Sequence, residues 1–144
     1  MSAPFSGQRI VVTGGASGIG RACCELLAER GAAVVVVDVN AEGARATAEA
    51  IGGEARQLDV GDVATIEACA AEIEQSLGPV DGLVNCAGLL QPDAAPPERL
   101  PFAIGDRLFE VNLRGTQAVC FAFGLRMAAR RGSCSRPCCT RPPT

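Results

Sequence analysis

The stretch Thr13-Gly14-Gly15-Ala16-Ser17-Gly18-Ile19-Gly20 joins a β-branched run that begins at Ile10 to a segment of helical periodicity that continues to about Arg30. Glycine lacks a Cβ and tolerates positive φ, so the pattern G-x3-G-x-G predicts a sharp turn that a ligand can approach closely. The free N–H groups and positive dipole end of the following helix favour an anion. The stretch therefore predicts a phosphate-binding loop, whose candidate binding residues are Gly14, Ser17, Gly18, Ile19 and Gly20.

Apolar runs and helical patterns alternate outward from this loop as far as about residue 130. Further strands are predicted at 33–37, 55–58 and 82–85, and further helices at 41–51, 62–77 and 105–130. The run Val34-Val35-Val36-Val37 is too uniformly apolar for a half-exposed strand, which indicates a parallel sheet covered on both faces. We expect an α/β fold of the Rossmann type: an incomplete, doubly wound parallel sheet with about four strands and four helices.

The periodicity also predicts which helix faces are buried. Asp62 is expected to cap the 62–77 helix. The first helix should bury a face made of Ile19, Ala22, Cys23, Leu26 and Leu27, and the 62–77 helix one made of Ile66, Cys69, Ala70, Ile73 and Leu77. Five cysteines in apolar segments are expected to act as small buried hydrophobes: Cys23, Cys24, Cys69, Cys86 and Cys120.

The second predicted strand is followed by Asp38, 24 residues after Gly14. A carboxylate at this place accepts hydrogen bonds from an adenosine ribose diol and repels a 2′-phosphate. Ser17 and Val39 add no positive charge nearby, so NAD is favoured over NADP as the cofactor. The competing interpretation is that the glycines make only a tight turn and that Asp38 is an ordinary acid at a strand end.

Three further motifs, in the expected order, complete a resemblance to the short-chain dehydrogenase/reductase family over residues 8 to about 130. Asp59-Val60 matches the pair that the family places against adenine. Asn85-Cys86-Ala87-Gly88 matches its N-x-A-G motif, with Cys86 where a second Asn is common, and makes Asn85, Ala87 and Gly88 candidate cofactor contacts. Val111-Asn112 matches the position of its catalytic Asn. Each has a structural alternative: Asp59 capping a strand end, Asn85 pinning strands through its amide, and Asn112 as a helix-surface amide.

The resemblance implies hydride transfer between a nicotinamide and an alcohol or carbonyl carbon, with a Tyr moving the proton and a Lys four positions later lowering the pKa of that Tyr. The chain contains no Tyr, and all thirteen of its basic residues are Arg. Of that catalytic set only Asn112 is present, so we expect a truncated or frame-shifted copy of an oxidoreductase that is inactive as written. The alternative is a non-catalytic dinucleotide-binding or interaction module.

The chain changes character after residue 130. Residues 131–144 contain no Val, Ile, Leu, Met or Phe, so we expect a dinucleotide-binding domain over 1–130 and a disordered Arg/Pro/Cys tail over 131–144. Residues 111–144 carry six Arg and no acid, but no aromatic residues beside the tail charges, so nucleic acid is not an expected partner. The tail cysteines, Cys134, Cys138 and Cys139, form an incomplete metal-ligand set, so no metal is expected.

The beginning of the chain lacks the pattern of a signal peptide, and no apolar run is long enough to span a membrane, so we expect a cytoplasmic protein. The strand 82–85 should be an open sheet edge. The last helix should leave apolar side chains without cover, so we expect the chain either to pair with a partner, for which a homo-oligomer is the candidate, or to be marginally stable. These side chains are Val111, Val119, Phe121 and Leu125.

Overall fold

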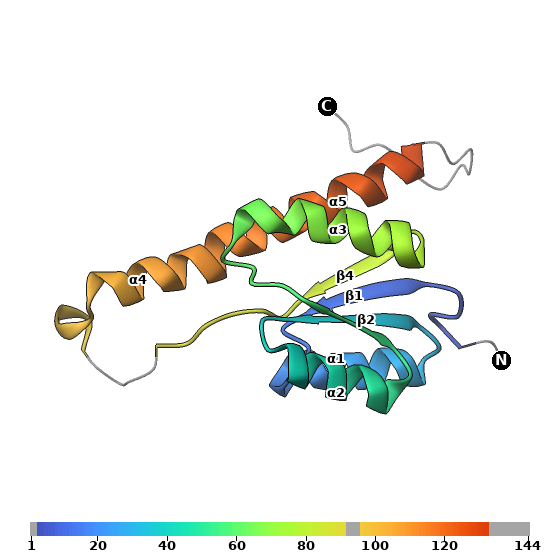
Figure 1. The fold of residues 1–144 in the computed structure, drawn as a ribbon, viewed down its shortest axis with the longest axis horizontal. Helices are drawn as coiled ribbons and strands as arrows, with labels where there is room; N and C mark the ends of the chain where they lie inside the picture. The colour runs from blue at the N-terminus through green and yellow to red at the C-terminus, as the bar shows by residue number, and fades with distance from the viewer. Residues whose placement is uncertain (1–2, 92–95, 133–144) are drawn as a thin grey trace.

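The computed structural model describes residues 3–91 and 96–132, which form the predicted α/β architecture (Figure 1). Four parallel strands make one sheet in the order β3-β2-β1-β4. Its strands are β1 (Arg9–Thr13), β2 (Ala33–Asp38), β3 (Glu54–Gln57) and β4 (Gly82–Asn85). Strands β1 and β4 are adjacent in the sheet but not consecutive in the sequence. Parallel strands of this kind are joined by helical crossovers, as in a doubly wound sheet.

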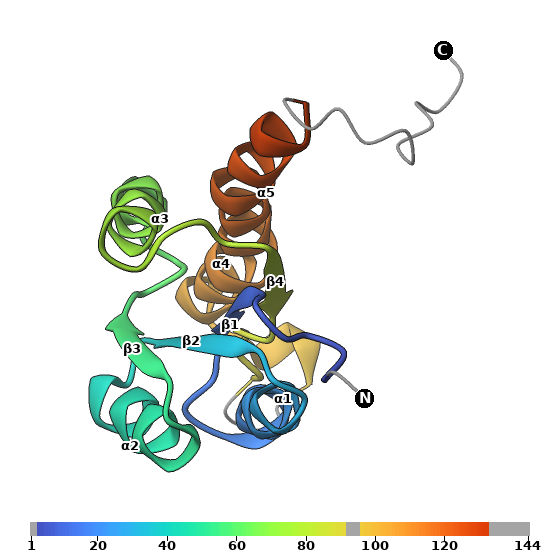
Figure 2. The same cartoon turned by 90° about the vertical axis from the view of Figure 1, so that its right-hand side faces the viewer.

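Helices cover both faces of the sheet (Figure 2). One face carries α1 (Gly18–Glu29) and α2 (Ala41–Ile51), and the other carries α3 (Val63–Leu77) and a long helical segment. That segment follows a 3-10 turn, Pro97–Arg99, and consists of α4 (Phe102–Phe109), the π-helical turn η2 (Glu110–Gly115) and α5 (Thr116–Gly132). It begins three residues before the predicted start and continues past residue 130, so the first two residues of the predicted tail are helical. The remaining tail residues lie outside the described ranges.

Alternate residues of the central strands enter two separate hydrophobic cores. Val11, Val35 and Val37 pack with α3 and α5, whereas Ile10, Val12 and Val36 pack with α1 and α2. Val34 to Val37 are each at most 3% exposed, which confirms that both faces of this strand are covered. The two central strands bury seven aliphatic side chains in this way, and removing this apolar surface from water favours folding: Ile10, Val11, Val12, Val34, Val35, Val36 and Val37.

Several local predictions were wrong. Strand β3 ends at Gln57, one residue earlier than predicted, although Leu58 is still buried. Asp62 does precede α3, but its side chain makes no capping hydrogen bond. Ile19, Ala22 and Leu26 are exposed, because the buried face of α1 centres on Gly20 and Cys24, where helix and glycine turn meet. Cys120 is also exposed.

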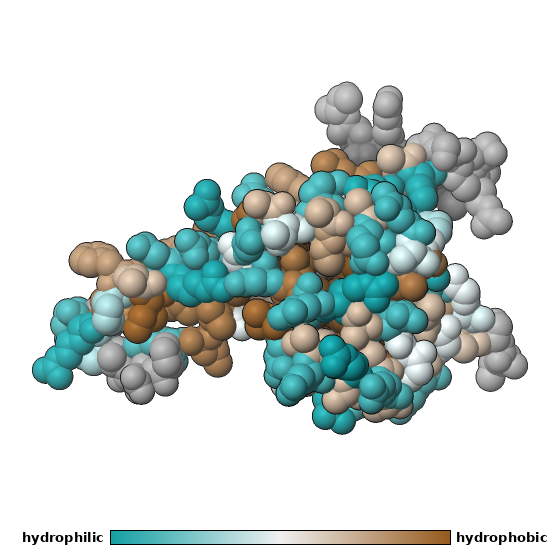
Figure 3. Space-filling model, viewed as in Figure 1, coloured by the Kyte–Doolittle hydropathy of each residue, from teal (hydrophilic) through white to brown (hydrophobic). Residues whose placement is uncertain are grey.

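The predicted open surfaces are partly present. Within the described ranges, β4 has a strand partner on one side only. Val111 and Val119 are buried in the core on the α3 side of the sheet, contrary to expectation, but Phe121 and Leu125 are 58% and 68% exposed. Figure 3 shows hydrophobic surface over α4, at the left of the view. Over residues 3–91 and 96–132, no helix combines the length and apolar character that crossing a membrane requires.

Candidate functional site

The glycine turn lies between the end of β1 and the start of α1. Gly14 and Gly18 have φ values of +68° and +54°, which L side chains rarely adopt. A Cβ on Gly14 would lie 2.7 Å from the backbone nitrogen of Ala87, and one on Gly20 would overlap the carbonyl oxygen of Gly14. Close packing against the segment after β4 and within the turn therefore requires glycine at positions 14 and 20, and the left-handed backbone favours glycine at position 18.

The start of α1 faces open space. Ser17 occupies the capping position with extended backbone, but its side chain makes no hydrogen bond to the helix. Ile19 is 79% exposed. A Cβ on Gly18 would meet nothing within 4 Å. Because the first backbone N–H groups of a helix have no internal acceptor, this end of α1 offers donors to an anion.

Asp38, the last residue of β2, is tied to the glycine turn. Its Oδ2 accepts a hydrogen bond from the Ala16 N–H at 3.0 Å, and its Oδ1 accepts one from the Asn40 N–H at 2.9 Å. Each carboxylate oxygen has a second lone pair, so both can still accept a hydrogen bond from a ligand hydroxyl. The side chain thus orders the turn and remains available at the edge of the sheet.

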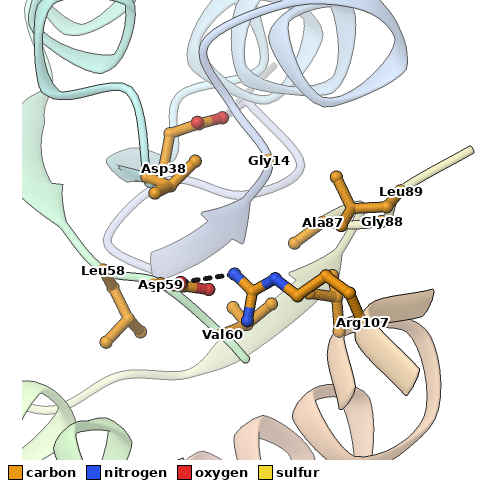
Figure 4. A pocket seen from close by; sticks show the side chains of 11 residues that line it. Gly14, Asp38, Leu58, Asp59, Val60, Ala87, Gly88, Leu89 and Arg107 are labelled. Atoms are coloured by element: carbon orange, nitrogen blue, oxygen red, sulfur yellow. Dashed lines mark hydrogen bonds and ion pairs between the residues drawn. The ribbon is translucent and has the colours of Figure 1, made fainter. Parts of the chain in front are cut away.

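Asp59 lies in the loop after β3 and forms an ion pair with Arg107 of α4 (Figure 4). The Arg107 Nη2 donates to Asp59 Oδ2 at 2.5 Å, and the Gly61 N–H donates to Asp59 Oδ1 at 2.8 Å. Burial alone would raise the pKa of Asp59, but these two hydrogen bonds outweigh it and hold that pKa below its ordinary value. Arg107 is not among the residues predicted from the sequence, although it stands five positions before Asn112.

Asn85, at the end of β4, connects three elements. Its Oδ1 accepts a hydrogen bond from Thr13 Oγ1 at 2.5 Å, and its Nδ2 donates to Thr116 Oγ1 of α5 at 3.0 Å. The Ala87 N–H in turn donates to Thr13 Oγ1 at 3.3 Å. Asn85 therefore makes contacts of the kind that its structural alternative predicted, in which the side-chain amide pins strands together.

Asn112 lies in the π-helical turn and contacts the segment after β4. Its Oδ1 accepts a hydrogen bond from the Leu89 N–H at 2.7 Å, and its Nδ2 donates to the Leu89 carbonyl at 2.8 Å. Gly115 closes the same turn, and a Cβ there would collide with the carbonyl oxygen of Val60. The turn thus brings the last helix against both the loop after β3 and the segment after β4.

These residues surround two adjoining cavities at the carboxyl ends of the strands, the place where open parallel sheets bind ligands. The larger cavity, about 850 Å³, is bounded by the glycine turn, the start of α1, the N-x-A-G segment and Asn112. The smaller, about 110 Å³, lies between Asp38, the loop after β3 and Arg107. All twelve predicted site residues line one or both: Gly14, Ser17, Gly18, Ile19, Gly20, Asp38, Asp59, Val60, Asn85, Ala87, Gly88 and Asn112.

Some residues that line the cavities were not among the predicted site residues. Leu89 and Leu90 border the larger cavity with Thr116, and Leu58 and Val111 border the smaller one. Thr116 follows Asn112 by one helical turn, a spacing that could have indicated it. Within the described ranges, no group of three or more Cys, Asp or Glu side chains is suited to hold a metal ion.

A parallel sheet with a glycine turn, a strand-end carboxylate and a cavity at the carboxyl ends defines a dinucleotide-binding class of α/β protein. The short chain dehydrogenase family profile matches residues 8–134, and the chain belongs to this family. Its members are NAD(P)-dependent oxidoreductases, as the resemblance implied.

Similar proteins include two curated polyol dehydrogenases. D-threitol dehydrogenase of Mycolicibacterium smegmatis is 40% identical, with 89% of this chain and 50% of the relative covered. Sorbitol dehydrogenase of Cereibacter sphaeroides is 44% identical, with 78% and 44% covered. The chain thus spans about half the length of the curated relatives it matches. A crystal structure described as ribose-5-phosphate isomerase from Brucella melitensis 16M is 48% identical, with a TM-score of 0.86 over 91% of this chain and 51% of that chain.

Proposed function

We propose that this chain binds the adenosine half of a nicotinamide dinucleotide, with NAD preferred over NADP. The observation that carries the proposal is the convergence of the glycine turn, the start of α1 and Asp38 on one cavity. The free N–H groups of the turn and of α1 suit a diphosphate. A side chain at Gly18 would project into the open space that the diphosphate needs, which explains the glycine there.

The preference for NAD rests on the charge balance near Asp38. Its carboxylate can accept hydrogen bonds from both ribose hydroxyls and would repel a 2′-phosphate. Arg107 lines the neighbouring cavity, but its guanidinium already pairs with Asp59 and, at 3.4 Å, with Glu110. The positive charge of Arg107 is therefore largely neutralised, and the balance around Asp38 remains unfavourable for a further phosphate.

Calorimetric titration of the full chain with NAD tests this assignment. We expect saturable binding that Asp38→Ala weakens by roughly 10–100-fold, since hydrogen bonds to a charged group contribute about 1.5–3 kcal/mol. NADP should bind to the wild-type chain more weakly than NAD. The difference in affinity between the two cofactors should be smaller for Asp38→Ala. Asp62→Ala is the matched control, because Asp62 lies outside both cavities. No heat of binding at millimolar NAD would refute the proposal.

We propose further that the 144-residue chain itself does not transfer hydride. A bound nicotinamide would accept or donate the hydride, but the protein must also move a proton, and this chain offers neither the Tyr nor the Lys that the family uses. The names of its polyol-specific relatives suggest a sugar alcohol as the substrate class of the complete protein. Incubation of the purified chain with NAD and D-threitol or sorbitol should therefore produce no NADH, and measurable turnover would contradict this.

The alternative function is a non-catalytic dinucleotide-binding or interaction module, which the lack of Tyr and Lys favours. Both hypotheses predict that the chain binds a nicotinamide dinucleotide. They differ on whether the chain derives from an oxidoreductase. The coding DNA distinguishes them: a reading frame after about Arg126 that encodes a downstream Tyr-x3-Lys supports an oxidoreductase. Its absence from every frame supports the module.

We also propose that copies of this chain associate. Phe121 and Leu125 of α5 and Val63 of α3 line an apolar groove of about 320 Å³, and no described strand pairs with the outer edge of β4. Contiguous apolar surface of this kind commonly marks a protein contact.

A further inference from the structure

The smaller cavity has one polar end and apolar sides. At the polar end lies the ion pair between Asp59 and Arg107, whose side chains are 36% and 43% exposed (Figure 4). The sides consist of aliphatic side chains: Val39, Leu58, Val60, Leu89 and Val111. Asp38 borders both cavities. A nucleoside whose ribose is held at Asp38 therefore finds apolar space for its base directly beside the ion pair.

Arg107 is held at this place from two sides. Its Nη2 donates to Asp59 at 2.5 Å, and its Nη1 donates to Glu110, three residues further along, at 3.4 Å. A Cβ on Gly61 would overlap Arg107 Nη1 and lie 2.9 Å from its Cζ. Gly61 does not have a positive φ, so the room that it leaves for the guanidinium explains the glycine at this position.

The ion pair also connects α4 to the loop after β3. In the part of the chain that the structure describes, no residue of α4 is buried. Figure 1 shows this helix projecting beyond the sheet. Because α4 contributes no side chain to the core, the ion pair of Arg107 with Asp59 is a contact through which the helix and the loop fix each other's position.

The ion pair offers a hydrogen-bond acceptor beside hydrogen-bond donors. Each Asp59 carboxylate oxygen already accepts one hydrogen bond and has a second lone pair. The Arg107 guanidinium has five N–H groups, of which two are used in its ion pairs. Adenine carries an amino donor at position 6 beside ring-nitrogen acceptors, whereas a 6-oxo purine carries an acceptor there. Adenine therefore matches the pair, and hypoxanthine would bring its carbonyl against the carboxylate.

We propose that Arg107 is a positioning residue for the base of the cofactor: by fixing the Asp59 carboxylate, it makes the smaller cavity select adenine over hypoxanthine. This inference rests on the proposed binding of the adenosine half, because a ribose held at Asp38 prevents hypoxanthine from turning over to match the pair in reverse order. Without Arg107, the carboxylate can rotate and accept a hydrogen bond from the adenine amino group or from the N1–H of hypoxanthine. The selection between bases then disappears, although binding itself remains.

Calorimetric titration of the full chain with NAD and with nicotinamide hypoxanthine dinucleotide tests the proposal. The two ligands differ only in the purine, which carries an amino group or an oxo group at position 6. We expect wild type to bind NAD roughly 10–100-fold more tightly, the effect of one hydrogen bond to a charged group. Arg107→Met has a side chain of similar length without donors and should reduce the ratio to about 3-fold or less. Arg45→Met, on the exposed side of α2, is the control and should keep the wild-type ratio.

The ratio separates a positioning role from a general structural one. If Arg107→Met weakens both ligands equally and keeps the wild-type ratio, the proposal is overturned. It is also overturned if wild type binds the two ligands equally. A wild-type chain that binds neither ligand would refute the proposed function itself, and this inference with it.

A second variant leaves Arg107 in the chain. Gly61→Ala should displace the guanidinium and lower the ratio as Arg107→Met does, because the added Cβ occupies the position of Nη1. A wild-type ratio in Gly61→Ala would contradict the proposal. Far-UV circular dichroism shows which variants are folded, and the comparison of the two ligands on wild type does not depend on them.

Hydrogen exchange measures the connection to α4. NAD should slow exchange of the α4 backbone amides in wild type, because the base engages the ion pair that holds this helix. The same ligand should leave their exchange in Arg107→Met unchanged. Equal slowing in both proteins would show that the base does not act through Arg107, and would also overturn the proposal.

Discussion

The side-chain amide of Asn112 makes two hydrogen bonds to the backbone of Leu89, one to its N–H at 2.7 Å and one to its carbonyl at 2.8 Å. The two residues are 23 positions apart and belong to the π-helical turn and to the segment after β4. Asn112, for which the resemblance implies a catalytic role, holds one wall of the larger cavity against the last helix.

Asn112→Ala should loosen this wall. Loss of both hydrogen bonds should lower the free energy of unfolding by about 1–2 kcal/mol, because each contributes about 0.5–1.5 kcal/mol and alanine has the better helix propensity. Hydrogen exchange at the Leu89 amide should become faster. Gln117→Ala, on the exposed side of α5, is the control and should leave that amide unchanged. Unaltered exchange in Asn112→Ala would show that these hydrogen bonds do not hold the segment.

Gly20→Ala and Gly124→Ala should have opposite effects on stability. A Cβ on Gly20 would overlap the Gly14 carbonyl oxygen, and it cannot be accommodated unless the turn moves, whereas one on Gly124 would meet nothing within 4 Å. We expect Gly20→Ala to lower the free energy of unfolding by about 2–4 kcal/mol and to abolish NAD binding. Gly124→Ala should raise that free energy by about 0.5–1 kcal/mol. Urea unfolding of both variants tests the pair, and equal stabilities would contradict the prediction.

Glu74 should make stability depend on pH. Its carboxylate accepts hydrogen bonds from Arg130 at 2.6 Å, Arg126 at 3.3 Å and the Val80 N–H at 3.3 Å. Burial raises the pKa of Glu74, but the hydrogen bonds from Val80, Arg130 and Arg126 outweigh it, and the pKa lies below its ordinary value. A carboxyl whose pKa is depressed on folding stabilises the protein above its unfolded pKa and loses that stabilisation as the pH falls through the folded value.

Glu74→Gln should therefore lower the free energy of unfolding by about 1–2 kcal/mol at pH 7. The loss is moderate because the ion pairs of Glu74 with Arg126 and Arg130 are only partly buried. The difference from wild type should shrink between about pH 5 and about pH 3, as Glu74 itself becomes protonated. Denaturant unfolding at several pH values measures it, with the exposed Glu49→Gln as the control. A difference that stays constant over this range would exclude the proposed role of Glu74.

Leu125→Glu should weaken self-association. Leu125 is 68% exposed on the groove between α3 and α5, where a charge could not be buried against a second copy without a large desolvation cost. Sedimentation velocity at increasing concentration should show association of wild type and less of it for the variant. Ala46→Glu places the same charge on α2, across the sheet, and should associate like wild type. Equal association of Leu125→Glu and wild type would place the contact elsewhere.

Much of the fold could be predicted because its signals are local. The uniform run Val34–Val37 requires cover on both faces, and the spaced glycines at 14, 18 and 20 permit one kind of turn. The exposure of Ile19 could not be predicted in the same way, because its periodicity fits the buried face of α1. Only the packing of the helix start against the glycine turn turns that side chain toward the cavity.

The order of residues along the chain determined the alternation of strands and helices, the glycine turn and the strand-end acid, because backbone stereochemistry and hydrophobic periodicity act over a few neighbours. Tertiary structure alone decided that Arg107 pairs with Asp59, 48 positions away, and that Asn112 holds Leu89. These contacts depend on how the helices pack on the sheet. That packing is set by the summed burial of the whole core, and no short stretch of sequence encodes it.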